Sequence, residues 1–171
     1  GQANERGRRM PKTKPTQNLT PGIHYDVIVV GGGHAGVEAA CAVARLGLSC
    51  TIVTLDCSAL GRLSCNPSIG GLGKSHLVHE IDVFGGVMGW ASDLSGIQFK
   101  TLNKTKGRAV WSSRAQVDKK KYPLIIQKHL KTLPLVSVLE DEVVSIKIKN
   151  NKIYGVKTKG GLFLRCASVV V

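Results

Sequence analysis

The first run of apolar positions, Tyr25–Val30, reads YDVIVV and is typical of a buried parallel strand. A glycine-rich turn over 31–36 follows it. The next stretch, VEAACAVARLGL, has the apolar spacing of a helix and ends near Gly47, a residue that often terminates helices. A second β-rich run occupies Cys50–Leu55. Strand, helix and strand within about thirty residues predict a βαβ unit with parallel strands.

The middle of the chain has a weaker pattern. Residues 56–72 are rich in Gly, Ser, Asn and Pro and predict a long loop. Residues 73–84 have helical spacing, whereas 85–96 are glycine-rich and predict an irregular segment. We expect one more strand at Ile97–Leu102.

The second half begins with a basic helical segment over 114–132, which Pro123 should kink or restart. Four short strands are then predicted, at LPLVSVL, VVSIKIK, KIYGVKT and GLFLRC. Asn150–Asn151 is suited to a hairpin turn, and Ala167–Val171 has the composition of another buried strand. The pattern predicts an α/β fold, Rossmann-like, with a parallel sheet and an added antiparallel β segment. We expect the domain to be incomplete at its C-terminus, since domains rarely end inside a strand.

Charge divides the chain unevenly. The net charge is +13, of which residues 98–131 contribute +9, whereas residues 23–97 carry −3. Residues 1–22 carry +4 and three of the six prolines, so they predict a basic flexible tail in front of one domain over 23–171. This distribution favours a polyanionic partner such as nucleic acid, with ordinary surface charge as the alternative.

Other classes of protein are disfavoured. No apolar run approaches the roughly 18–20 residues of a membrane-spanning helix, so we expect no membrane partner. Five cysteines without a Cys-x-x-Cys motif argue against a disulfide framework and for a reducing compartment. His76 and His79 could share a helix face, but no third ligand accompanies them, so we expect no metal site.

The glycine-rich turn has the spacing Gly31-x-Gly33-x-x-Gly36. Such glycines permit a tight turn, a close approach of the backbone to a pyrophosphate, and close packing of helix on strand. His34 and Ala35 would open the helix, whose N–H groups attract phosphates. Because the motif lies between a strand and a helix, we predict a dinucleotide-binding loop rather than a purely structural turn.

The residue expected to bind a ribose is not acidic here. The end of the second strand places Thr54 at that position, with Asp56 two residues later. Thr54 can make one hydrogen bond but no bidentate contact, which disfavours a nicotinamide site relative to a cofactor that other segments also hold. Gly73–Ser75 resembles the end of the phosphate-binding P-loop of ATP- and GTP-binding proteins. That motif also requires a glycine five residues before Gly73, where this chain has Ser68, so ATP or GTP binding is not predicted.

Two further features are candidates for chemistry. Cys65 lies in a loop, Ser64–Pro67, where a thiol could act as a nucleophile or acid/base; from the residues alone a small buried thiol is the favoured interpretation. Cys41, Cys50 and Cys166 occupy apolar periodic positions and predict core residues. The candidate RNA-binding residues of the basic segment are Lys104, Lys106, Arg108 and Arg114. Its aromatic residues, Phe99, Trp111 and Tyr122, would either stack on bases or belong to the core.

Three stretches, VIVVGGGHAGVEAACAVARLG, LSCNPSIGGLGKSHLVHEID and GIQFKTLNKTKGRAVWSSRAQVDKKKY, together resemble the N-terminal part of the MnmG/GidA family. The resemblance runs from about residue 25 to residue 171. It implies an FAD-dependent tRNA-modifying protein that acts with an MnmE-type GTPase on carbon 5 of wobble uridine, where it adds a carboxymethylaminomethyl or taurinomethyl group. It also implies that the Gly31–Gly36 loop, with His34, Ala35 and Thr54, holds FAD and that Cys65 is catalytic.

Family members are several times longer, so the rest of the FAD domain, the NADH-binding insertion and the C-terminal helical region would lie elsewhere. The residues therefore leave open whether the chain acts as an enzyme. One interpretation is the N-terminal part of the modifying enzyme, which in this family looks dimeric. The alternative is a truncated, non-catalytic RNA-binding component of a large ribonucleoprotein such as a mitochondrial ribosome, which would bind FAD weakly or not at all. The basic tail suggests a mitochondrial location, with the cytoplasm as the alternative.

Overall fold

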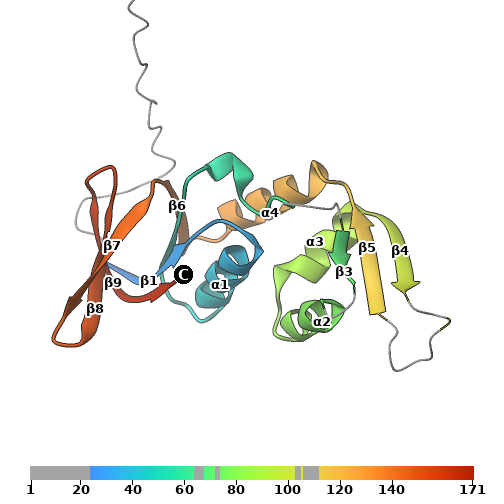
Figure 1. The fold of residues 1–171 in the computed structure, drawn as a ribbon, viewed down its shortest axis with the longest axis horizontal. Helices are drawn as coiled ribbons and strands as arrows, with labels where there is room; N and C mark the ends of the chain where they lie inside the picture. The colour runs from blue at the N-terminus through green and yellow to red at the C-terminus, as the bar shows by residue number, and fades with distance from the viewer. Residues whose placement is uncertain (1–23, 64–67, 72–73, 103–104, 106–111) are drawn as a thin grey trace, which may run out of the picture.

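The structure is a computed structural model that describes residues 24–63, 68–71, 74–102, 105 and 112–171. A six-stranded sheet and a three-stranded sheet lie at opposite ends of the molecule, with α1 and α4 between them (Figure 1). The elements are β1 (His24–Val30), α1 (His34–Arg45), β2 (Cys50–Thr54), η1 (Cys57–Ala59), β3 (Ser68–Gly70), α2 (Ser75–Val83), α3 (Val87–Ser95), β4 (Gly96–Leu102), β5 (Ser112–Val117), α4 (Lys121–Thr132), β6 (Val136–Glu140), β7 (Val143–Lys149), β8 (Lys152–Thr158) and β9 (Phe163–Val170). None of the helices in the described ranges is long and apolar enough to span a membrane.

The six-stranded sheet has the order β6-β2-β1-β9-β8-β7. β1 pairs in parallel with β2, and α1 connects them, so the predicted βαβ unit is confirmed. Gly47 ends α1 with a φ of +75°, as its position predicted. Consecutive β1 residues face opposite sides of the sheet. Ile28 and Val29 are both fully buried, but they belong to different core clusters. This two-sided burial explains the continuous apolar run.

β9 corrects one prediction. The segment GLFLRC and the residues from Ala167 onward were expected to be separate strands, but they form one strand because no turn residue divides them. Its first half pairs antiparallel with β8, and from Arg165 onward it pairs in parallel with β1. The other predicted strands of this region are confirmed as β6, β7 and β8. The hairpin turn is confirmed too, since Asn150 and Asn151 have φ angles of 51° and 58°.

The smaller sheet has the order β3-β5-β4 and is antiparallel. The strand predicted at Ile97–Leu102 is confirmed as β4. The helix predicted from residue 114 was wrong at its start, because residues up to Val117 form β5. α4 begins at Lys121, and Pro123 lies in its first turn, where a missing N–H costs nothing. Asp118 accepts hydrogen bonds from the N–H groups of Lys120 and Lys121 and fixes that start.

The segment 85–96 was predicted to be irregular, but Val87–Ser95 forms α3. The carboxylate of Glu38, in α1, accepts hydrogen bonds from the N–H of Val87 (2.9 Å) and of Met88 (2.7 Å). This side chain from another helix caps α3, and no local pattern announces it. The predicted helix over 73–84 is confirmed as α2, whereas the expected long loop contains η1 and β3.

Two apolar cores lie on the two faces of the six-stranded sheet. The larger core packs α1, α3 and α4 against one face, and the smaller one lies among β1, β2, β6, β8 and β9 on the other. Cys41, Cys50 and Cys166 are buried, as predicted. Tyr122 is fully buried in the larger core and is therefore no platform for a base. The glycine-rich loop over 31–36 begins at the carboxyl end of β1 and lies next to the carboxyl end of β2.

Candidate functional site

The glycine turn at the end of β1 has the geometry that its spacing predicted. Gly31 has a φ of +106°, which favours glycine, and its N–H donates to the Val53 carbonyl at 2.8 Å. A Cβ at Gly36 would collide with the carbonyl oxygen of Gly31 and would lie 3.3 Å from Val29 Cγ1. The helix can therefore approach the strand only because residue 36 has no side chain.

The first turn of α1 is open. Gly33 is the residue before the helix; no side-chain cap is formed there, and the first turn contains no acidic residue. A Cβ at Gly33 would meet no described atom within 4 Å. The first-turn N–H groups, at His34, Ala35 and Gly36, are thus the kind of donors that bind a phosphate at a helix N-terminus.

Thr54 ends β2 next to this loop, as the sequence predicted. A Cβ at Gly32 would lie 2.9 Å from Thr54 Oγ1, so the threonine side chain is buried directly behind the loop. The Asp56 carboxylate accepts hydrogen bonds from the N–H (2.8 Å) and hydroxyl (2.5 Å) of Ser58, and these hydrogen bonds lower the pKa of Asp56. Asp56 therefore caps η1 and is an ionised group at this end of the sheet.

His34 is the residue of the loop whose side chain faces the core. Its ring meets the ring of Tyr122 edge-on, with centroids 5.7 Å apart, and burial lowers the pKa of His34. The Tyr122 hydroxyl is buried without a hydrogen-bond partner among the described residues. His34 is therefore neutral near pH 7. Its ring packs against Tyr122 behind the loop and does not supply a positive charge to a bound phosphate.

This burial predicts a pH dependence of stability. The unfolded chain binds a proton at His34 near pH 6.5, whereas the folded protein binds it only at lower pH, so stability falls as pH drops below about 6.5. We expect the difference in unfolding free energy between pH 7.5 and pH 5.5 to shrink in His34→Gln. Denaturant unfolding at both pH values measures it, with His76→Gln, at an exposed position of α2, as the control. Equal pH dependence in wild type and His34→Gln would contradict the prediction.

The described thiols are poor nucleophiles. Burial raises the pKa of Cys41 to about 11, of Cys50 to about 12 and of Cys57 to about 11. All three are therefore protonated at neutral pH. Cys65, the predicted catalytic residue, lies outside the described residues, as do Lys104, Lys106 and Arg108.

Arg114, the remaining predicted RNA-binding residue, lies on β5. Its Nη2 donates a 2.8 Å hydrogen bond to the hydroxyl of Ser68, the first residue of β3. β5 and β3 are neighbouring antiparallel strands, with Arg114 opposite Gly70. Arg114 therefore fixes the strand that directly follows the predicted Cys65 loop.

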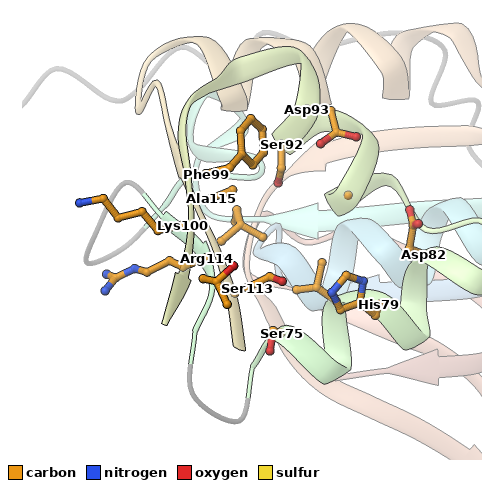
Figure 2. A pocket seen from close by; sticks show the side chains of 15 residues that line it. Ser75, His79, Asp82, Ser92, Asp93, Phe99, Lys100, Ser113, Arg114 and Ala115 are labelled. Carbon is orange, nitrogen blue, oxygen red and sulfur yellow. The ribbon is translucent and has the colours of Figure 1, made fainter. Parts of the chain in front are cut away.

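A cavity of about 380 Å³ lies beside Arg114, between α2, α3 and the three-stranded sheet (Figure 2). Its polar lining residues include Ser75, His79, Ser92, Asp93 and Lys100. The sequence did not predict it, because α3 was expected to be irregular and β5 to be helical. The only available signal was the position of His79 on a helix with apolar spacing. No group of three metal-ligating side chains occurs in the part of the chain that the structure describes.

The family model described as glucose inhibited division protein A (GIDA) matches residues 26–171. The tRNA uridine 5-carboxymethylaminomethyl modification enzyme MnmG of Aquifex aeolicus is 48% identical over 147 residues, which are 86% of this chain and 24% of that protein. The solved structure of Aquifex aeolicus GidA in its form II crystal is similar with a TM-score of 0.82 and 46% identity, over 85% of this chain and 24% of that one.

A more distant likeness concerns the fold alone. PqsL of Pseudomonas aeruginosa, described as a probable FAD-dependent monooxygenase, is similar in fold with a TM-score of 0.61 at 15% identity, over 86% of this chain and 42% of its own. The chain spans about a quarter of the length of the curated relatives it matches. The α/β class predicted from the sequence is confirmed by these structures.

Proposed function

Because this chain belongs to the glucose inhibited division protein A (GidA) family, we propose that it serves tRNA uridine modification as the part that holds the pyrophosphate of FAD. The observation that carries this proposal is the open loop at the end of β1. Gly31, Gly33 and Gly36 each have the backbone setting that the fingerprint requires, and no side chain caps the helix behind them. A purely structural turn would not need an uncapped helix N-terminus.

The residues fit FAD at one end of the cofactor. The N–H groups at the start of α1 would bind the pyrophosphate, and the absent Cβ at Gly33 leaves room for its approach. When bound, FAD supplies reversible two-electron transfer. The chain itself orients the phosphates through the helix dipole, while the half-buried, neutral His34 packs against the buried ring of Tyr122 behind the loop.

The finer features of the reaction are part of the same proposal. The resemblance supports carbon 5 of wobble uridine as the target, Cys65 as nucleophile or acid/base, and an MnmE-type GTPase as partner. A taurinomethyl group is one form of the product that the resemblance implies. We also propose a mitochondrial location, which the basic tail over 1–22 suggests. In this proposal Arg114 supports the Cys65 loop from the strand that follows it, through its hydrogen bond to Ser68.

The test uses the protein isolated with its native partners. We expect flavin absorption bands that travel with the protein and free FAD on acid release. Cys65→Ser should abolish uridine modification and keep the flavin, whereas Cys57→Ser, at a hydrogen-bonded backbone position beside Glu140, should leave both unchanged. Loss of activity in both variants would refute the specific role of Cys65.

The second candidate is a non-catalytic RNA-binding component of a large ribonucleoprotein. The observation that favours it is the charge of +9 on residues 98–131. A protein that carries RNA but no flavin after isolation would support this candidate and refute the enzymatic proposal. Flavin together with Cys65-dependent modification would refute the structural role.

A further inference from the structure

The end of β2 lacks the free carboxylate that a dinucleotide fold uses to bind a ribose. Thr54 occupies that position, is 9% exposed, and directs its hydroxyl to the Asp56 carbonyl oxygen at 3.5 Å. Both oxygens of the Asp56 carboxylate have partners, because Oδ1 accepts the hydrogen bonds from Ser58 and Oδ2 lies 3.7 Å from Arg62. Neither residue is therefore suited to accept hydrogen bonds from the hydroxyl groups of a ribose.

The neighbouring strand brings a carboxylate to the same place. β6 pairs in parallel with β2, and Glu140, its last residue, lies directly beside Thr54 in the register. Oε2 of Glu140 accepts a 2.9 Å hydrogen bond from the N–H of Cys57, in the segment that follows β2. The carboxylate thus extends across to the end of β2, although its backbone lies one strand spacing away, about 4.8 Å.

The Glu140 side chain can accept further hydrogen bonds. It is exposed, and it takes no part in the ion pairs among the described residues, which are Arg62–Asp56 and Lys159–Glu142. A carboxylate has two oxygens and about four lone-pair sites, of which the Cys57 N–H uses one. Two hydroxyl donors of one ligand can therefore bind without displacing the Cys57 hydrogen bond.

Glu140 lies at the edge of the sheet that contains the glycine loop. β1, β2 and β6 are parallel neighbours, so their carboxyl ends meet at one edge. A Cβ at Gly32 would lie 2.9 Å from Thr54 Oγ1, so the loop packs against the residue beside Glu140. In dinucleotide folds the pyrophosphate binds at the start of the first helix and the ribose binds over the end of the second strand. A ribose in that position would face the Glu140 carboxylate.

We propose that Glu140 accepts hydrogen bonds from the hydroxyl groups of the adenosine ribose of FAD, in place of an acidic residue at the end of β2. The inference rests on the proposed function, because the pyrophosphate loop defines where the ribose lies. It makes β6 a part of the cofactor site and gives the site a preference for ribose over deoxyribose.

The test uses the flavin-free full-length protein and measures equilibrium binding. FAD is titrated first, and ADP and 2′-deoxy-ADP then compete with it. We expect wild type to bind ADP roughly tenfold more tightly than 2′-deoxy-ADP, as for a hydrogen bond to a charged group. In Glu140→Gln we expect FAD and ADP to bind roughly tenfold more weakly and the preference for ADP to fall to about twofold. Equal binding of the two nucleotides by wild type would overturn the proposal without reference to any variant.

Two further variants identify the acid that is responsible. Glu142→Gln is the matched control, because its carboxylate lies two residues further along the chain and pairs with Lys159 at 2.8 Å. It should keep the wild-type preference for ADP. Asp56→Asn should lower stability through the loss of its cap on η1 but also keep the preference. Loss of the preference in either variant, with its retention in Glu140→Gln, would overturn the assignment to Glu140.

The outcomes separate this inference from the proposed function. Failure of wild type to bind FAD would remove both, whereas FAD binding without a preference for ADP over 2′-deoxy-ADP would remove only the inference. Denaturant unfolding of Glu140→Gln shows whether its fold is intact. We expect stability close to that of wild type, because the amide oxygen still accepts from the Cys57 N–H. Weaker FAD binding with an unchanged preference for ADP would assign Glu140 to support of the loop alone and overturn the proposal.

Discussion

Gly36→Ala is expected to destabilise the protein and remove its cofactor, whereas Gly33→Ala should remove the cofactor alone. At residue 36 a methyl group would overlap the Gly31 carbonyl oxygen, so strand and helix must separate, at a cost of about 3 kcal/mol of unfolding free energy. At residue 33 a methyl group meets no described atom within 4 Å, and the loss of stability should be at most about 1 kcal/mol. It would, however, stand on the open side where a pyrophosphate approaches.

Denaturant unfolding and flavin titration of the full-length protein measure the two effects separately. We expect FAD affinity to fall by roughly 10- to 100-fold in Gly33→Ala, which corresponds to the loss of one charge-assisted hydrogen bond. Wild-type flavin affinity in Gly33→Ala would show that the loop does not hold the pyrophosphate. Wild-type stability in Gly36→Ala would show that the contact between helix and strand is looser than described.

Glu38→Ala should lower the unfolding free energy by about 3 kcal/mol. Glu38 is 9% exposed, and its carboxylate accepts three hydrogen bonds, from the N–H groups of Val87 and Met88. Alanine would leave these donors without a partner at a buried helix start. Because α3 forms one side of the cavity, the variant should also weaken any ligand that binds there.

Glu38→Gln provides the graded comparison, since an amide oxygen can still accept from one N–H, and should lose about half as much stability. Glu80→Ala, at an exposed position of α2, is the matched control and should change stability by less than about 0.5 kcal/mol. Thermal and denaturant unfolding measure all three variants. A loss in Glu38→Ala no larger than in Glu80→Ala would mean that α3 forms without its cap.

The sequence predicted those elements whose stability is local. The βαβ unit and the Asn150–Asn151 hairpin have periodicity and turn residues that are sufficient by themselves. α3 was missed because its cap comes from Glu38 in another helix. β5 was missed because its strand conformation depends on pairing with β3 and β4 on its two sides, which the pattern within 114–132 does not show, and a basic sequence beside Pro123 favours a helix when those partners are ignored.

The same distinction holds for the candidate site. Gly31, Gly33 and Gly36 could be found from spacing, because the fingerprint is contiguous and its glycines act through their own backbone. Arg114 was identified as a candidate for RNA, but its position opposite Lys100 and its bond to Ser68 depend on the sheet. The cavity needs two helices and three strands at once, so no linear motif predicts it.

The pairing of β9 with β1 has a consequence for how the protein folds while the ribosome synthesises it. His24 meets Arg165, roughly 140 residues later, so translation takes on the order of ten seconds before β1 obtains its second neighbour. Until then the strand that carries the glycine loop is an open sheet edge, which in a nascent chain invites aggregation and chaperone binding. FAD-binding competence should thus arise late in synthesis, only after the nascent chain has exposed residues 163–170 outside the ribosomal tunnel.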